Sequence, residues 1–364
     1  MKHPVRTVLI LAIPLQWLSL KALSFFPDIV ENYYAQGIYT YLSKGLRFSF
    51  GALHFSLGQL LFYVGFLYVI IQLIRFSRAI KKNRNQRKKI FTNGLLNAIS
   101  YFSIIYLLFN TLWAVNYHRE PLQQTFNLAL EEPNANALKE LCETLIERTN
   151  KSRTLVINSA NNWQDYSLTN DSLFRHAVSS YREASHSYPI LKYEVASIKA
   201  VALPKIMSYA GIGGIYFPFT GEANVNTDPP LFKLPFTTCH EMAHQLGFAS
   251  ETDANFVSYL VCSTSTNPLF NYSGNLAAMR YSMSALYRSD STAYVYLTKQ
   301  YSPELVSDLD INKAYWKQFE SPFEDISHSI NDVFLKANGQ SEGIRSYGKM
   351  VDLLLANFKQ QQRP

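Results

Sequence analysis

The chain is organised around the stretch Cys239–His244, which reads Cys-His-Glu-Met-Ala-His. On a helix, His240 and His244 lie four residues apart, so both imidazoles project from one face. Two neutral imidazoles at this spacing typically hold a divalent metal, most often zinc. Glu241 then lies beside the metal position, where its carboxylate can accept a proton from a metal-bound water. The pattern therefore predicts a Zn²⁺ site with Glu241 as the catalytic base.

The residues around this motif favour a buried helix. The alternative interpretation is a surface helix that carries two histidines by chance. Against it, apolar side chains fill the neighbouring positions Met242, Ala243, Leu246 and Phe248. A buried apolar helix that retains two histidines and a glutamate needs a polar partner for them, and a metal ion is such a partner.

Two carboxylates follow the motif and can complete the site. Gly247 predicts a left-handed turn at the end of the helix, and Ser250 is a suitable N-cap for a second helix. Catalytic zinc needs three protein ligands and one open position, so Glu251 or Asp253 can supply the third. The longer side chain reaches further from the first turn of a helix, which favours Glu251. Asp253 would otherwise be a first-turn helix charge or a hydrogen-bond partner of a ligating imidazole.

The segment 215–226, just upstream of the motif, reads as two short strands around Thr220-Gly221. Pro218 restricts the first strand to the edge of a sheet. An edge strand near the metal can bind an extended peptide by strand addition, and a plain hairpin is an equal alternative. On the first interpretation, the candidate substrate-binding side chains are Tyr216, Phe217 and Phe219.

Three tyrosines are candidates to hydrogen-bond a tetrahedral oxyanion. They are Tyr216, Tyr272 and Tyr281. Because the chain has 24 tyrosines, packing is the more common role for each of them.

The apolar residues concentrate in the first 118 positions of this 364-residue chain, which is 48% hydrophobic and 17% charged. Segments 5–23, 50–74 and 95–115 are long enough to cross about 30 Å of hydrocarbon as helices. The first could be a cleaved signal peptide, but no small-x-small cleavage site closes it, which favours an uncleaved helix. The third ends near Trp113 and Tyr117, which suit a membrane interface.

Eight basic residues lie within 75–89, between the second and third spans. The positive-inside rule places this segment in the cytoplasm, and three spans then place the loop 26–49 and everything after residue 118 outside. Topology explains the basic residues better than lipid or nucleic-acid binding does, so the net charge of +7 predicts no nucleic-acid partner. We expect a multi-pass protein of the cytoplasmic (inner) membrane.

The sequence divides into a transmembrane region, 1–117, and an extracytoplasmic domain, 118–364. The second part is predicted to be mostly helical with a small sheet, so the fold class is mainly α (α+β). The expected helices lie near 133–146, 173–181, 272–286, 294–299 and 344–358, with one long helix or two, broken near Pro322, over 311–337; a strand is expected within 193–203.

Three cysteines are too few for a disulfide framework. Cys239 and Cys262 could pair in an oxidising compartment and bridge the metal helix to the next one. Two buried thiols are the alternative, and slightly favoured, because burial is a common fate of cysteine.

The run 236–256 resembles a bacterial domain-of-unknown-function family whose members are taken to be membrane-anchored zinc metallopeptidases. Segments 218–226 and 346–354 and the three spans resemble it too, so the resemblance covers nearly the whole chain, although only the motif run is specific. The piece 251–255 is also similar to the Glu-x-x-Ala-Asp of membrane gluzincins, whose Glu binds zinc, which implies Glu251. Where the family commonly has Glu-x-Glu-Ala-Asn, Asp253 replaces the second Glu, which weakens position 253 as a ligand.

These observations together predict a zincin-like hydrolase that cleaves a peptide or protein of the cell envelope. An amidase acting on cell-wall peptides would use the same metal chemistry on a different substrate. A non-catalytic envelope sensor or scaffold that retains the metal site is the alternative from another functional class.

Overall fold

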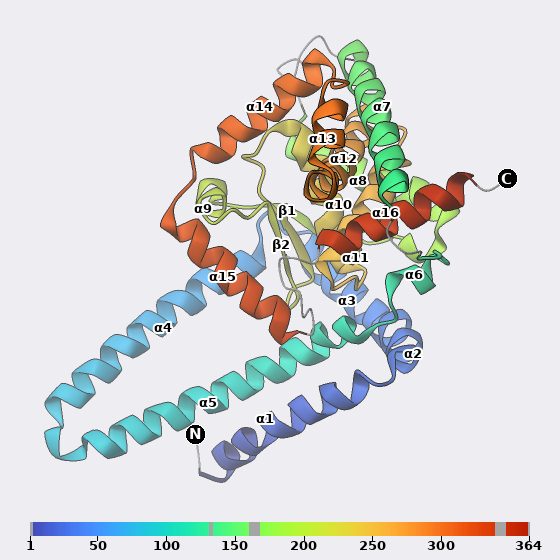
Figure 1. Cartoon of the computed structure of the whole chain (residues 1–364). Coiled ribbons are helices and arrows are strands. Elements are labelled where there is room, and N and C mark those ends of the chain that lie inside the picture. Colours follow the sequence, from blue (N-terminus) through green and yellow to red (C-terminus); the bar gives the residue numbers. More distant parts are fainter. Residues whose placement is uncertain (1–2, 131–133, 160–167, 339–346, 363–364) are drawn as a thin grey trace.

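The computed structural model describes residues 3–130, 134–159, 168–338 and 347–362. Long helices extend from one side of a helical domain that contains a small sheet (Figure 1). The predicted mainly α fold, with three N-terminal apolar helices and a small sheet, is confirmed.

Three helices are long and apolar enough to cross a membrane: α1 (His3–Leu23), α4 (Leu57–Lys82) and α5 (Arg87–Leu112). Most of their apolar side chains are exposed, as lipid-facing surfaces require. The basic connection between α4 and α5, which includes η2 (Arg84–Gln86), points away from the domain, and so does the N-terminal end of α1 (Figure 1).

The helix limits differ from those expected for the second and third spans. The second was expected to begin at residue 50, but the chain breaks after Gly51 and α4 begins at Leu57. Ser56 is its N-cap, and the Ser56 hydroxyl accepts a hydrogen bond from the Gln59 N–H. The third span begins earlier than expected and ends at Leu112. Hydropathy reports apolar content but does not locate caps, which explains both shifts.

The segment 26–49, which was expected as a loop between the first two spans, is helical over most of its length. It forms α2 (Pro27–Ile29), the π-helix η1 (Val30–Ile38) and α3 (Tyr39–Gly51). The Ser43 hydroxyl on α3 donates to the backbone carbonyl of Gln245 at 2.7 Å, and the Arg47 guanidinium donates to the carbonyl of Val195 at 2.7 Å. This segment is therefore packed against the domain that carries the His240–His244 motif.

The sheet has three strands in the order β1-β3-β2. They are β1 (Ile198–Ala200), β2 (Gly214–Phe217) and β3 (Glu222–Val225). Strand β1 is parallel to β3, and β2 is antiparallel to it, pairing Gly214 with Val225 and Phe217 with Glu222. Strand β2 lies at an edge, as Pro218 predicted, and the expected strand over 193–203 is only three residues long.

Two charged side chains of the sheet fix the break between α3 and α4. The buried Glu222 carboxylate accepts from the backbone N–H groups of Leu57 at 3.0 Å and Gly58 at 2.6 Å. The Lys199 ammonium donates to the carbonyls of Gly51 and Leu53 at the end of α3. An anion at a helix N-terminus and a cation at a helix C-terminus are both favourable, so the sheet determines where the apolar helix α4 begins.

Replacing Glu222 with alanine removes the acceptor of the N–H groups of Leu57, which is partly buried, and Gly58, which is buried. We expect a loss of about 2–4 kcal/mol in the free energy of unfolding, because the lost bonds are charge-assisted and the Gly58 donor stays buried. Chemical unfolding of the full chain in detergent measures this. Glu194→Ala is the control, since Glu194 pairs with Lys44 and Lys192 at the surface and its loss should leave the midpoint unchanged. Equal midpoints for both variants would contradict the capping role.

Helix α10 (Leu234–Gln245), which carries the motif, lies at the centre of the domain. It contacts β2 and β3 on one side and α8 (Asn170–Ser187), α11 (Glu251–Ser263) and α12 (Pro268–Ser289) elsewhere. The side-chain amide of Gln245 donates to the carbonyls of Ser197 at 2.8 Å and Gly221 at 2.7 Å. These bonds join the end of α10 to the sheet.

Of the two alternatives for 311–337, the structure has two helices that are separated just before Pro322. The remaining helices surround the core of the domain. They are η3 (Ala114–His118), α6 (Leu122–Thr125), α7 (Ala135–Ser159), η4 (Pro189–Leu191), α9 (Pro204–Tyr209), η5 (Leu231–Lys233), α13 (Ser291–Thr298), α14 (Pro303–Lys317), α15 (Pro322–Ala337) and α16 (Tyr347–Gln362). The expected helix over 344–358 corresponds to α16; positions 344–346 fall outside the described residues.

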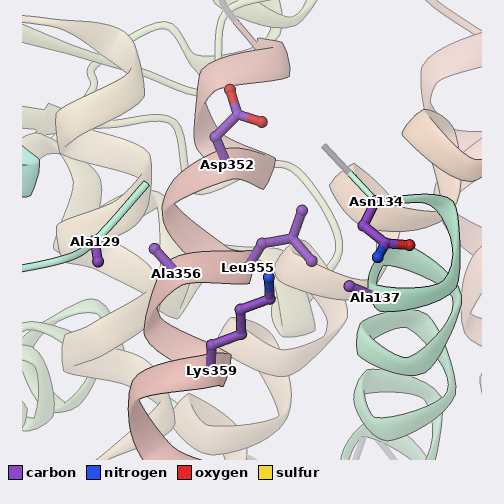
Figure 2. A pocket seen from close by; sticks show the side chains of 7 residues that line it. All are labelled: Ala129, Asn134, Ala137, Asp352, Leu355, Ala356 and Lys359. Atoms are coloured by element: carbon purple, nitrogen blue, oxygen red, sulfur yellow. The ribbon is translucent and has the colours of Figure 1, made fainter. Parts of the chain in front are cut away.

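A small hollow remains where α16 packs beside α7 (Figure 2). Its volume is about 10 Å³, and Asn134, Asp352 and Lys359 contribute its polar lining. A space of this size holds about one water, so it is too small for a substrate or cofactor.

Candidate metal centre

The turn between α10 and α11 is built on Gly247. Its φ is 85°, in the left-handed region, as the sequence predicted. A Cβ at this position would lie 2.9 Å from the Tyr39 ring and 3.0 Å from Asn116 Oδ1, so there is no room for a side chain. Ser250 then caps α11 by accepting from the Asp253 N–H at 3.2 Å. The turn folds the start of α11 back toward the histidines of α10.

Glu251 reaches both histidines. Its Oε2 lies 3.3 Å from His240 Nε2, and its Oε1 lies 3.6 Å from His244 Nε2. The three potential ligand atoms all lie within 4.8 Å of one another. A tetrahedral zinc ion with bonds of about 2.0–2.1 Å separates its ligand atoms by about 3.3 Å. The spacing between the carboxylate and the imidazoles therefore fits such an ion.

Hydrogen bonds orient both imidazoles for metal binding. The Nδ1 of His240 donates to Asn255 Oδ1 at 3.0 Å, and the Nδ1 of His244 donates to the carbonyl of Phe248 at 2.7 Å. With Nδ1 engaged in these bonds, Nε2 is the ring atom that faces Glu251 and would supply the metal ligand once it loses its proton. Neither hydrogen-bond partner was predicted from the sequence. Asn255 could have been found, because it follows Glu251 by four residues and therefore lies on the same helix face.

Glu241 lies buried against the edge strand, with 4% of its surface exposed. Within the part of the chain that the structure describes, its Oε2 has no hydrogen-bond partner. A Cβ added to Gly214 of β2 would lie 2.4 Å from Glu241 Oε1, so only glycine permits this approach. Burial raises the pKa of Glu241 to about 7, although charge on His240 and His244 opposes the shift. A buried carboxylate oxygen without a partner is available to accept a proton from a water.

The Glu251 carboxylate pairs with the imidazoles of His240 and His244. Burial alone would lower the pKa of His240, but the hydrogen bond and charge of Glu251 outweigh burial and raise it to about 9. Burial alone would raise the pKa of Glu251, but the two histidines outweigh it and hold the value below the usual range. The carboxylate is therefore stabilised as an anion that faces two imidazoles, and this is the donor set a divalent cation requires.

Asp253 is not part of this cluster. Its electrostatic neighbours are Arg119, Ser250, His244 and Glu31, and burial raises its pKa to about 6. The Arg119 guanidinium itself forms a buried ion pair with Glu31 at 2.7 Å. Asp253 thus occupies the first turn of α11 as a helix charge, which is one of the two alternatives left open by the sequence.

An aromatic group made of Tyr39, Trp113 and Tyr216 forms one wall of the site. The Trp113 ring lies 5.7 Å from the His244 ring and 4.7 Å from the Tyr216 ring. The Tyr39 hydroxyl lies 3.1 Å from the Tyr216 hydroxyl and 3.3 Å from the carbonyl oxygen of His244. Trp113 is only 4% exposed, so its indole packs inside the protein and not on the outer surface. The chain turns into η3 after α5, which buries the indole against His244.

The three candidate substrate-binding aromatics separate onto two sides of the sheet. Tyr216 faces α10, with its ring 6.4 Å from the His244 ring. Phe217 instead packs on Gly58 at the start of α4, and the Phe219 ring lies 5.7 Å from the Phe217 ring. Alternation of side chains along a strand explains the difference. Of the three, only Tyr216 lies beside the histidines.

The other two tyrosines considered for an oxyanion lie elsewhere. The buried Tyr272 hydroxyl donates to Asp308 at 2.6 Å. Tyr281 lines a basic cavity of about 370 Å³ with Lys233 and Arg280. Tyr272 and Tyr281 therefore face Asp308 and the basic cavity, and Tyr216 is the candidate that lies beside the histidines.

Of the two alternatives for Cys239 and Cys262, a disulfide or two buried thiols, the structure has the thiols. Cys239 and Cys262 are both buried and are free thiols. Burial and the neighbouring Cys262 thiol hold the pKa of Cys239 well above its ordinary value. Both therefore behave as unreactive packing groups.

The fold and the cluster define a mainly α chain with three apolar helices and a His-His-Glu set of potential metal ligands. Residues 34–355 match the family described as "Protein of unknown function (DUF3810)", and the chain belongs to this family. The matched range begins within η1 and includes every residue of the cluster. A search of curated proteins gave no match, and neither did a search of solved structures.

A pair of substitutions distinguishes the two carboxylates. Glu251→Gln should weaken zinc binding by at least about 100-fold, because a charged ligand is lost. Asp253→Asn should leave it unchanged, because Asp253 lies outside the cluster. Chelator competition on the purified full chain measures both dissociation constants. Loss of affinity in Asp253→Asn with retention in Glu251→Gln would reverse the assignment.

Proposed function

We propose that the chain is a membrane-anchored, zinc-dependent hydrolase of peptide or other amide bonds. The observation that carries this proposal is the convergence of His240, His244 and Glu251 within 4.8 Å beside the partnerless oxygen of Glu241. When bound, zinc would lower the pKa of a water to about 7 and polarise a carbonyl. This donor set and a neighbouring carboxylate suit metal-assisted hydrolysis.

The residues of the site have separate roles in this proposal. His240 and His244 hold the ion through Nε2, with Asn255 and the Phe248 carbonyl keeping the rings in place. Glu241 accepts a proton from the attacking water and passes it to the leaving amine. Its burial against Gly214 keeps the carboxylate fixed and away from bulk solvent.

The edge strand supports an extended peptide as the substrate. Strand β2 pairs with β3 on one side only, and its Gly214 lies against Glu241. An extended segment that paired with the outer side of β2 would place its backbone next to the proposed base. A protein and a cell-wall peptide both satisfy this requirement, so protease and amidase are two versions of the same proposal.

An open coordination position favours an enzyme over a scaffold. Across residues 3–130, 134–159, 168–338 and 347–362, the cluster contains three ligands and not a fourth. Structural zinc sites are typically closed by four protein ligands, whereas catalytic sites keep one position for water. A non-catalytic sensor that retains the metal has no comparable support.

The variant Glu241→Gln tests the chemistry directly. It preserves the shape of the side chain and removes the base, so zinc should stay bound while hydrolysis falls by at least about 100-fold. The full chain in nanodiscs is incubated with a peptide library, cleavage is followed by mass spectrometry, and metal content is measured in parallel. Glu194→Gln, a change at the exposed Glu194, is the matched control. An active Glu241→Gln enzyme would eliminate this mechanism.

We also propose that the domain lies outside the cytoplasm, on the outer face of the inner membrane. The support is the basic α4–α5 connection, which projects from the opposite end of the spans. Envelope peptides or proteins are then the accessible substrates. Since the basic cluster lies away from the domain, nucleic acid is not proposed as a partner.

Reporter fusions after Pro364 test this orientation. Alkaline phosphatase, which needs an oxidising compartment, should be active at this position. A fluorescent reporter that matures only in the cytoplasm should be dark. Matched fusions within the α4–α5 connection should show the opposite pattern. A fluorescent fusion at Pro364 would reverse the orientation.

A further inference from the structure

Helix α15 exposes a stripe of apolar side chains along one face. The exposed fractions of Phe323, Ile326, Ile330 and Val333 are 52, 55, 65 and 67%. The last three follow Phe323 by 3, 7 and 10 residues. Because an α-helix turns by about 100° per residue, all four side chains lie on one face. On another side of the helix, Leu335 is buried at 3% exposure. The helix therefore buries part of one side and presents its most apolar face outward.

Polar side chains flank this stripe. Asp332 and Lys336 form an ion pair at 2.6 Å, and Asp325 and Ser329 are exposed. A helix with one exposed apolar face and one polar face is typical of segments that lie in a membrane interface. On a domain surrounded only by water, a contiguous apolar stripe of this kind is uncommon.

The stripe is continuous with the surface of an apolar helix that can span the membrane. The Phe334 ring, 41% exposed, lies 6.0 Å from the Phe109 ring of α5, three residues before that helix ends. Leu107 and Leu108 on the same turn of α5 are 50 and 46% exposed. In Figure 1, α15 runs crosswise to α4 and α5 near their domain ends. The exposed face of α15 thus begins where the lipid-facing surface of α5 ends.

The apolar surface also extends to α9. Ile206 and Tyr209 of that helix are 56 and 47% exposed. The Tyr209 ring packs edge-on against Phe319, just before α15, at 5.0 Å between centroids. The exposed side chains of α9 therefore lie beside the segment that leads into α15.

We propose that α15 is an interfacial membrane helix that docks the domain on the bilayer crossed by α1, α4 and α5. Its occupant is the boundary between lipid headgroups and acyl chains, because the stripe continues the lipid-facing surface of α5 and lies across the span ends. The orientation of the helix fits this plane. A helix parallel to the membrane surface buries one face and keeps its flanking charges in water.

Docking of α15 fixes the height of the metal cluster above the membrane. Trp113 follows α5 directly and touches His244, so the cluster already lies close to the membrane end of that helix. An interfacial α15 holds the domain down against the bilayer. If the cluster is catalytic, a consequence that rests on the proposed function, the cleaved bond must come close to the membrane surface.

Spin-label accessibility in the full chain tests the proposal. Single cysteines are introduced at Ile326, Ile330 or Val333, labelled with a nitroxide and reconstituted in lipid nanodiscs. The three native cysteines are fully buried at 0% exposure and serve as the unlabelled background. Collision with oxygen, which enriches in lipid, is compared with collision with a water-soluble nickel chelate.

Two sets of controls calibrate the measurement. Leu67→Cys, at a 57% exposed position of α4, defines lipid exposure. Glu194→Cys defines exposure to water, and Asp325→Cys and Ser329→Cys report the polar flanks of α15 itself. Unchanged thermal midpoints show that the labelled chains are folded, and surface positions of this kind tolerate substitution.

The expected result is an oxygen-to-nickel collision ratio at Ile326, Ile330 and Val333 that approaches the Leu67 value, with ratios at Asp325 and Ser329 several-fold lower. Ratios at the stripe equal to the Glu194 value would mean exposure to water and would overturn the proposal. Protection of the stripe from both reagents would also overturn it, because a protein surface or a second copy of the chain would then cover α15.

Discussion

The approach of one carboxylate to two imidazoles constrains the rest of this structure. Glu251 can reach His240 and His244 only because the chain reverses at Gly247, in a left-handed conformation that a larger residue would not fit. Groups that are charged and buried are tolerated when they pair, and here they pair with one another and with Asn255. The packing around the turn, including Tyr39, maintains this arrangement.

The same packing joins the cluster to the apolar helices. Trp113 leaves the end of α5 and enters the wall beside His244, while α3 lies against the end of α10. Glu222 on β3 caps α4, and the neighbouring edge strand β2 lies against Glu241 at Gly214. The candidate metal centre is therefore built from both parts of the chain. Trp113 and α3 therefore link the cluster to the apolar helices through direct contacts.

Local chemistry made several features predictable. A four-residue histidine spacing, a glycine turn, a serine cap and a proline next to a strand each act within a few residues, so the sequence indicated α10, the turn, α11 and the edge position of β2. Features that depend on distant partners were not predictable in this way. The segment 26–49 was interpreted as a loop between two spans, yet it packs as helices on the domain. The direction of Phe217 likewise depends on which helix covers each side of the sheet.

The sequence by itself determined the mainly α class, the three apolar helices and the potential ligands His240 and His244, because periodicity and composition are properties of short segments. Only the tertiary structure decided that Glu251, and not Asp253, faces both histidines, that Asn255 orients one of them, and that Trp113 is buried beside the cluster. The reason is physical. Each of these outcomes depends on distances between elements that are set by packing across the whole domain, and no local pattern of residues encodes such a distance.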